Sequence, residues 1–162
     1  EDTEEIVRSV LMHAECPVVV DADGITCIAG HIPEGRALVF TPHEAELSRL
    51  VGKDASDDVI EGFCGKGHVI LRKGAVDRIY SCGCMRMNRT GSPGMTVGGT
   101  GDVLAGTVAG LMAKGMEGFD AACLAARICG LAGEKAYSEN SYGMTATDVI
   151  DRIGPVLKEG LE

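Results

Sequence analysis

The hydrophobic residues in the first half of the chain follow two alternating patterns, one with helical spacing and one of short unbroken runs. Helical spacing between residues 2 and 14 predicts a first helix. Short apolar runs of this kind are typical of parallel strands that are covered on both faces. Three such runs lie at residues 18–20, 37–40 and 68–71. After the second run, helical spacing predicts one helix that ends at Gly52 and a shorter one that Ser56 caps.

The second half of the chain predicts a hairpin followed by three helices. Residues 76–80 and 85–87 are expected to pair as antiparallel strands around residues 82–84. Small residues in the second of the three helices favour close packing. The helices are expected at about residues 102–114, at about 119–137, and after a cap at Thr145 or Thr147. Strands that alternate with helices predict a single α/β domain over residues 1–162, with no linker and no internal repeat.

Polar segments directly follow three of the predicted strands. They are residues 21–23, 41–43 and 73–74. In a parallel sheet the ligand lies outside the carboxyl ends of the strands, so we expect all three segments to face one crevice. Asp21 and Asp23 alternate along an extended segment, which predicts that they face opposite ways and do not chelate one metal together.

Composition and charge limit the classes of protein to which the chain can belong. A length of 162 residues suffices for one domain, and a hydrophobic share of 45% excludes a disordered chain. The net charge of −9 argues against nucleic-acid and membrane partners, which require a basic surface. It is compatible with a phosphate ligand, because helix N-termini and backbone amides bind phosphate without many cations.

The seven cysteines and the hydropathy of the chain indicate a cytoplasmic protein. No Cys-x-x-Cys pair occurs, and Cys82 and Cys84 alone are too few for a zinc site, so we expect buried, reduced thiols. No signal peptide is visible, and no apolar run approaches the roughly 18 residues that a membrane span requires.

The glycine-rich segment at residues 90–106 is the strongest chemical signal. Glycines at positions 94, 98, 99 and 101 lead directly into a predicted helix. Residues without side chains let a pyrophosphate approach the backbone, and the first helical turn offers free N–H groups and a positive dipole end. The segment is neither a Walker A loop nor a Gly-x-Gly-x-x-Gly fingerprint. The plainer alternative is a helix start that simply needs a glycine turn.

Three charged residues near these segments allow both a functional and a plain interpretation. Asp102 either takes a proton from a hydroxyl that is about to be phosphorylated, or only stabilises the first turn of a helix. Lys73 either binds phosphate or is a surface lysine, and His43 either binds a substrate or merely begins a helix.

Taken together, these residues resemble one family, the NAD(P)H-hydrate dehydratases, also known as the carbohydrate-kinase-related YjeF C-terminal domain. The resemblance spans nearly the whole chain in order, and the glycine-rich block is its most specific part. The matching segments are residues 21–25, 41–46, 73–77, 91–104 and 143–148.

The resemblance implies a ribokinase-like three-layer α/β/α fold with a mostly parallel central sheet. It also implies that ATP or ADP, with Mg²⁺, drives the repair of hydrated NADH or NADPH through phosphorylation of the ring hydroxyl. Asp102 would be the catalytic base and would contact the substrate together with His43. The nucleotide would be held by the turn Lys73, Gly74, Ala75, Val76 and Asp77, and by the loop Ser92, Pro93, Gly94, Met95, Thr96, Val97, Gly98, Gly99, Thr100 and Gly101.

The chain departs from the family pattern at three places. Asp77 replaces a threonine and adds a charge near the nucleotide, and Glu44-Ala45 replaces Pro-Gly behind His43. Family members also carry further strands and helices before the segment that matches Glu1. We therefore expect the C-terminal part of the dehydratase domain, a sheet without its N-terminal strands, and self-association as a homo-oligomer through the exposed sheet edge.

Two alternative functions remain open at this stage. One is a small-molecule kinase of the same fold that acts on a hydroxyethylthiazole or hydroxymethylpyrimidine alcohol. The other is a non-catalytic nucleotide-binding fragment or oligomer-forming module. The sequence does not distinguish ATP from ADP and names no metal ligands.

Overall fold

The computed structural model describes residues 2–32 and 37–160, which form a mixed sheet between two layers of helices. The strands lie in the order in which they occur along the chain: β1 (Val18–Val20), β2 (Leu38–Phe40), β3 (Val69–Arg72), β4 (Asp77–Ser81) and β5 (Cys84–Asn88). The pairs β1–β2 and β2–β3 are parallel, and β4 is antiparallel to both of its neighbours. Only β4 therefore runs against the other strands, and the predicted hairpin is confirmed.

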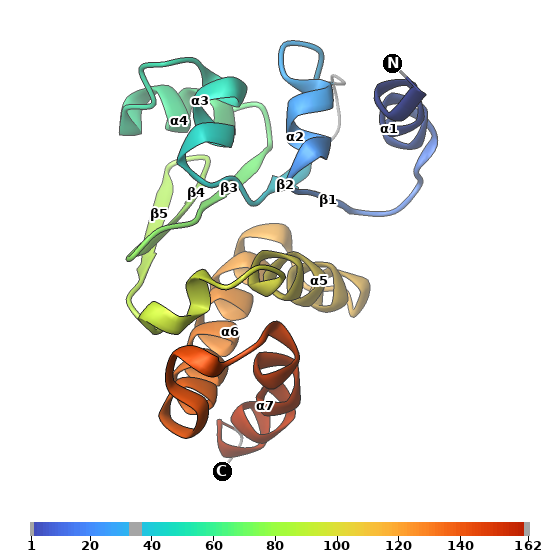
Figure 1. The fold of residues 1–162 in the computed structure, drawn as a ribbon. Coiled ribbons are helices and arrows are strands. Elements are labelled where there is room, and N and C mark those ends of the chain that lie inside the picture. The colour runs from blue at the N-terminus through green and yellow to red at the C-terminus, as the bar shows by residue number, and fades with distance from the viewer. Residues whose placement is uncertain (1, 33–36, 161–162) are drawn as a thin grey trace.

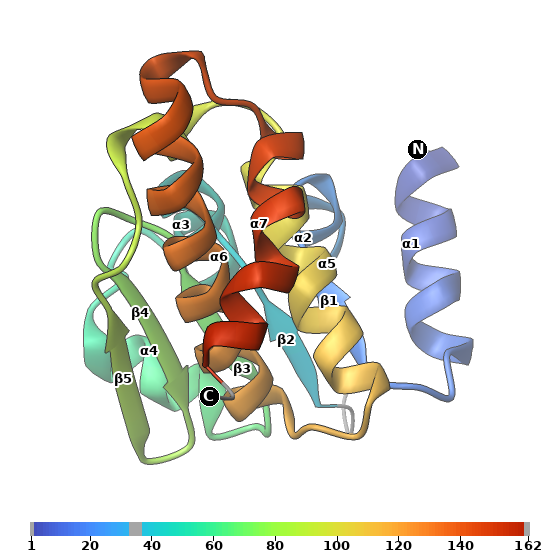
Figure 2. The same ribbon diagram turned by 90° about the horizontal axis from the view of Figure 1, so that it is seen from below.

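Helices from the two halves of the chain cover opposite faces of this sheet (Figure 1). The first half supplies α2 (Asp23–Ile28), α3 (Glu44–Val51) and α4 (Asp57–Cys64), while α1 (Asp2–His13) packs against α2 beyond the β1 edge (Figure 2). The second half supplies α5 (Thr100–Ala113), α6 (Gly118–Asn140) and α7 (Ala146–Glu159), and Figure 2 shows these three helices lying over the other face. Two short 3₁₀ helices, η1 (Pro93–Thr96) and η2 (Ser141–Gly143), complete the chain.

Side chains that alternate along the strands divide the core into two clusters. Phe40 and Ile70 pack with α2, α3 and α4, whereas Val39 and Leu71 pack with α5, α6 and α7. Both strands are thus buried on both faces, as their unbroken apolar runs predicted. The small residues of α6 permit close contact, because a Cβ on Gly130 would come within 2.1 Å of the Thr90 hydroxyl.

Two predictions about the first half of the chain were incomplete. Asp23 does not continue an extended segment but begins α2, a six-residue helix that buries Ile25 and Ile28. An Asp-Gly pair usually marks a turn, and the helix forms because its two isoleucines fill the core. On α1, Leu11 is buried, but Ile6 remains 63% exposed, so only part of the predicted apolar face is covered.

The cysteines differ from the prediction in their burial. All seven thiols are free, but only Cys64 and Cys129 are buried, and three are exposed: Cys16, Cys82 and Cys84. The last two flank Gly83 at the tip of the β4–β5 hairpin. None of the helices in residues 2–32 and 37–160 is long and apolar enough to cross a membrane.

Candidate functional site

A cavity of about 840 Å³ lies at the carboxyl ends of the parallel strands, between the glycine-rich loop and α6. Its wall includes His43 after β2, the turn that begins with Lys73 after β3, and the loop through Gly101. Residues from the far half of the chain close its apolar side: Leu104, Ala126, Cys129 and Gly130. The polar segments after β2 and β3 therefore meet the glycine-rich loop, as the strand-end argument predicts.

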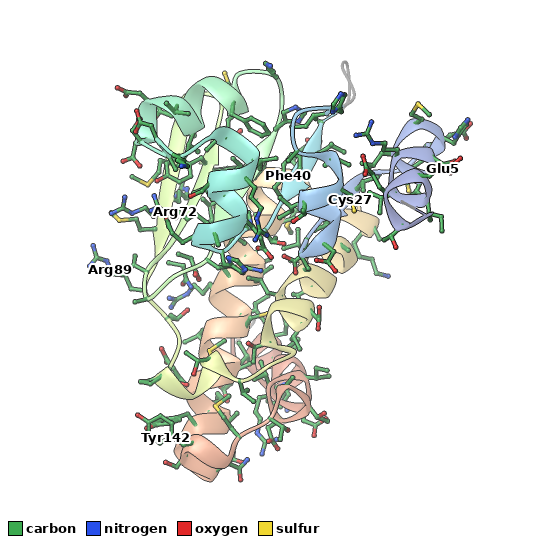
Figure 3. All side chains as sticks on the ribbon, turned by 45° about the horizontal axis from the view of Figure 1, so that its top comes forward. Glu5, Cys27, Phe40, Arg72, Arg89 and Tyr142 are labelled. Atoms are coloured by element: carbon green, nitrogen blue, oxygen red, sulfur yellow. The ribbon has the colours of Figure 1, made fainter. Side chains whose placement is uncertain are left out.

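Most of the residues expected to hold a nucleotide line this cavity, with two exceptions. Val76 is 37% exposed and does not line it. Gly94 packs away from it, since a Cβ on Gly94 would come within 2.6 Å of the Met144 sulfur and 2.7 Å of the Tyr137 ring. Tyr142, which stacks edge-on against Tyr137, marks this far side of the loop in Figure 3. Gly94 thus anchors the loop to the C-terminal helices.

The glycine-rich loop delivers the start of α5 to the cavity without a side-chain cap. Gly99 precedes the helix with a φ of 93°, a left-handed conformation that favours glycine. The Thr100 hydroxyl donates to the carbonyl groups of Met95 (2.7 Å) and Val97 (3.0 Å) and so fixes the loop behind the helix. No side chain in the described part of the chain caps α5, so its first amides stay available to an anion.

Asp102 lies in the first turn of α5 and is exposed. Its carboxylate forms no hydrogen bond or ion pair with any residue in the ranges that the structure describes. It does not itself line the cavity, although its neighbour Gly101 does. A carboxylate without an internal partner at this place is free to accept a proton from a bound hydroxyl.

Lys73 is held by a carboxylate at the end of β1 and by a second one in the first turn of α3. Its ammonium lies 2.8 Å from Asp21 Oδ1 and 4.0 Å from Glu46 Oε2, and its backbone N–H donates to the Pro42 carbonyl at 2.8 Å. The position of a Cβ on Gly101 would be 3.5 Å from the Lys73 nitrogen. A positive charge therefore stands directly beside the start of α5.

The side chain of His43 caps α3, and both of its ring nitrogens contact residues of that helix. Its Nδ1 accepts from the backbone N–H of Ala45 (3.1 Å) and of Glu46 (3.3 Å), and its Nε2 lies 3.2 Å from Glu46 Oε1. Glu46 completes the capping box by accepting from the His43 backbone N–H at 2.8 Å. The ring is about half exposed, so its face and carbon edge remain open to a ligand.

Asp77 ties the Lys73 turn to the root of the hairpin. Its carboxylate accepts from the Gly74 backbone N–H (3.1 Å) and from Asn88 Nδ2 (3.0 Å). Asn88 is buried and also joins the Thr90 hydroxyl to the Ala126 carbonyl. Burial raises the pKa of Asp77, although both hydrogen bonds oppose this shift.

Sequence reasoning did not find Glu46 and Asn88. The three-residue spacing from His43 to Glu46 is the signal of a capping box, although histidine is an unusual first member of one. Asn88 carries no local signal, because its partner Asp77 lies opposite it on the neighbouring strand.

The donor set fits a magnesium ion that is bound largely through phosphate. Across residues 2–32 and 37–160, no three His, Cys, Asp or Glu side chains gather in a way that could hold a metal ion. Asp21 and Glu46 already face Lys73, which leaves Asp102 as the free carboxylate beside α5. Mg²⁺ commonly uses one or two carboxylates and takes its other oxygens from phosphate and water.

Comparison with known proteins places this geometry in context. A family model described as NAD(P)H-hydrate dehydratase matches residues 1–155. The bifunctional NAD(P)H-hydrate repair enzyme Nnr of Hyperthermus butylicus is 42% identical over 178 residues, covering 100% of this chain and 33% of that enzyme. The chain therefore spans about a third of the length of this relative.

Solved structures agree with the family match. A ribokinase-like superfamily protein of Enterococcus faecalis has a TM-score of 0.81 at 26% identity, covering 96% of this chain and 58% of its own. The ADP/ATP-dependent NAD(P)H-hydrate dehydratase of Bacillus subtilis, co-crystallised with ATP and Mg²⁺, has a TM-score of 0.81 at 28% identity. That alignment covers 96% of this chain and 59% of the other. The predicted ribokinase-like fold is confirmed.

Proposed function

The chain belongs to the NAD(P)H-hydrate dehydratase family, and we propose that it carries the nucleotide site and the catalytic aspartate of an ADP- or ATP-dependent enzyme of this kind. The substrate is hydrated NADH or NADPH, and the reaction restores the reduced dinucleotide. Within the family's domain, the chain corresponds to its C-terminal part.

One observation carries the proposal: the cavity unites Lys73, the uncapped start of α5 and the ring of His43. Free amides and an ammonium group on one wall suit the phosphates of a nucleotide. The apolar wall formed by α5 and α6 suits a base or ribose, which bury carbon surface.

In the proposed reaction Asp102 accepts the proton of the ring hydroxyl while that oxygen attacks the terminal phosphorus of the nucleotide. The new O–P bond forms as the bond to the leaving phosphate oxygen breaks, and Lys73 and the α5 amides stabilise the charge on the phosphate oxygens. The carbon–oxygen bond then breaks and inorganic phosphate leaves. When a proton leaves the neighbouring ring carbon, the electron pair of its former C–H bond forms the restored double bond.

Mg²⁺ would neutralise the phosphate oxygens when it is bound with the nucleotide. The residues of the chain would act on Mg²⁺ and the phosphates chiefly through their charges. Asp102 offers one carboxylate, and Lys73 balances the negative charge on the side of β3.

Turnover of hydrated NADH tests the proposal. The chain is incubated with hydrated NADH, Mg²⁺ and either ADP or ATP, and the return of NADH is followed by its absorbance. We expect NADH to reappear only with nucleotide, and to fail to reappear in the Asp102→Asn variant. Phosphorylation of a thiazole or pyrimidine alcohol without any recovery of NADH would overturn the proposal in favour of a kinase.

A further inference from the structure

Three polar side chains from neighbouring parallel strands lie in a row beneath the start of α5. Asp21 follows β1, Thr41 follows β2 and Lys73 follows β3. Successive side chains of a strand point to opposite faces, so residues two positions apart share a face. The residues two positions earlier pack on the side of α5 and α6: Val19, Val39 and Leu71. The row therefore faces α5.

Lys73 spans this row from β3 to β1, and its ammonium lies 2.8 Å from the carboxylate of Asp21. Both charged groups approach the start of α5, since a Cβ on Gly101 would lie 3.5 Å from the Lys73 nitrogen and 3.9 Å from Asp21 Oδ2. An anion at the first amides of α5 would compete with Asp21 for the ammonium. Moving Lys73 towards that anion would leave a largely buried carboxylate without its partner, which is costly.

Thr41 is the unused member of the row. It is completely buried, and its hydroxyl has no hydrogen-bond partner among residues 2–32 and 37–160. Its backbone N–H donates to the Val20 carbonyl at 3.2 Å, and Phe40 pairs with Val20, so Thr41 lies beside Asp21. A buried hydroxyl without a partner is unusual and calls for an explanation.

We propose that Asp21 and Thr41 are positioning residues which exchange hydrogen-bond partners when phosphate binds. In the structure, Asp21 holds Lys73 beside Gly101. When a nucleoside diphosphate occupies the start of α5, Lys73 turns to its phosphate oxygens and the Thr41 hydroxyl donates to Asp21 instead. Glu46 does not lose all of its partners in this exchange, because its carboxylate still accepts from the backbone N–H of His43 and still contacts the His43 ring. The inference rests on the proposed nucleotide site.

The test is the dissociation constant of ADP for matched variants at position 41. Thr41→Val keeps the shape of the side chain but removes the donor, so we expect ADP to bind at least about tenfold more weakly, as for the loss of a hydrogen bond to a charged group. Thr41→Ser keeps the donor and should bind ADP about as tightly as the wild type. Because the hydroxyl has no partner among residues 2–32 and 37–160, Thr41→Val should not lower the melting temperature measured without ADP.

Asp21→Asn supplies the second arm, because it removes both the competitor for Lys73 and the charge that Thr41 must satisfy. We expect this variant to bind ADP at least as tightly as the wild type. In the Asp21→Asn background, Thr41→Val should weaken ADP binding by less than about threefold. The difference between this loss and the loss in the wild-type background is the coupling that a double-mutant cycle measures. If Thr41→Val lost the same ADP affinity in both backgrounds, or bound ADP as tightly as the wild type, the proposed exchange of partners would be wrong. The proposed nucleotide site would not be affected by either result. A wild-type chain that binds no ADP would overturn both.

Discussion

The ammonium nitrogen of Lys73 lies 3.5 Å from the point that a Cβ on Gly101 would occupy. This proximity joins the end of β3 to the start of α5, two segments that are nearly thirty residues apart in the sequence. In the proposed site a phosphate oxygen binds between this ammonium group and the free amides of α5, beside a residue 101 that has no side chain.

Replacing Gly101 with alanine should therefore impair binding without impairing folding. The new methyl group would meet Lys73 and Asp21 only at ordinary contact distances, and alanine is favoured over glycine in a helix by about 1 kcal/mol. We expect Gly101→Ala to keep its melting temperature but to bind ADP at least about tenfold more weakly by calorimetry, a loss comparable to that of a bond to a charged group. Gly106→Ala is the control, since its Cβ would meet nothing within 4 Å. Equal affinity for the two variants would contradict this account of Gly101.

The catalytic assignment of Asp102 separates turnover from binding. Asp102→Asn removes the proton acceptor, and loss of general base catalysis typically lowers rates by about 10²–10⁴-fold. The affinity for ADP measured without Mg²⁺ should change little, because the proposed phosphate contacts are the α5 amides and Lys73 rather than Asp102. Asp120 also lies in the first turn of a helix and is exposed, so Asp120→Asn serves as the control. If Asp102→Asn turned over hydrated NADH at the wild-type rate, the only role of Asp102 would be to stabilise the first turn of α5.

Asp77 predicts a pH dependence of stability with a definite sign. Burial raises its pKa in the folded protein above the ordinary value of 3.8. The folded state therefore holds the proton of Asp77 more tightly than the unfolded state does. The contribution of this proton to the free energy of unfolding is fully present below the ordinary pKa of 3.8. It is lost as the pH rises through the folded-state pKa.

The Asp77→Asn variant has no such proton to lose. Its melting temperature relative to the wild type should rise between about pH 3.5 and about pH 7, measured by circular dichroism in closely spaced buffers. A constant offset would reflect only the altered bond to Asn88 and would contradict the buried charge.

The close contact between Gly130 and Thr90, which both line the cavity, predicts that a side chain at position 130 lowers the stability of the fold. A Cβ on Gly130 would come within 2.1 Å of the Thr90 hydroxyl and 2.8 Å of its backbone carbon, so the segment at Thr90 must shift. We expect Gly130→Ala to lose about 1–3 kcal/mol of stability in urea unfolding, as overpacked cores do. Gly110→Ala, whose Cβ meets nothing within 4 Å, should lose none. Equal stability of the two variants would argue against the tight packing of α6.

The convergence of strand ends on the glycine-rich loop was open to prediction because it follows from local patterns. Parallel strands share the edge at which they end, and a glycine-rich segment before an apolar periodic stretch marks an exposed helix start. The cavity lined by His43, Lys73 and Gly101 agrees with that argument.

Features that depend on partners distant in the sequence were not predictable. The bond from Asp77 to Asn88 requires the register of β4 and β5, which no spacing reveals. Helix α2 has only six residues and is stabilised by the burial of Ile25 and Ile28 rather than by helical propensity. The exposure of Cys82 depends on how the hairpin tip packs in the folded chain, which composition does not specify.

The melting temperature of the chain as a function of ADP concentration, with Mg²⁺ present, tests most directly whether the start of α5 captures phosphate. A ligand that binds only the folded state at a hundred times its dissociation constant adds about 2.7 kcal/mol, or about 5–10 °C for a domain of this size. We predict a rise of this order for the wild type and a much smaller one for Lys73→Ala. A melting temperature that stays constant up to millimolar ADP would contradict the account.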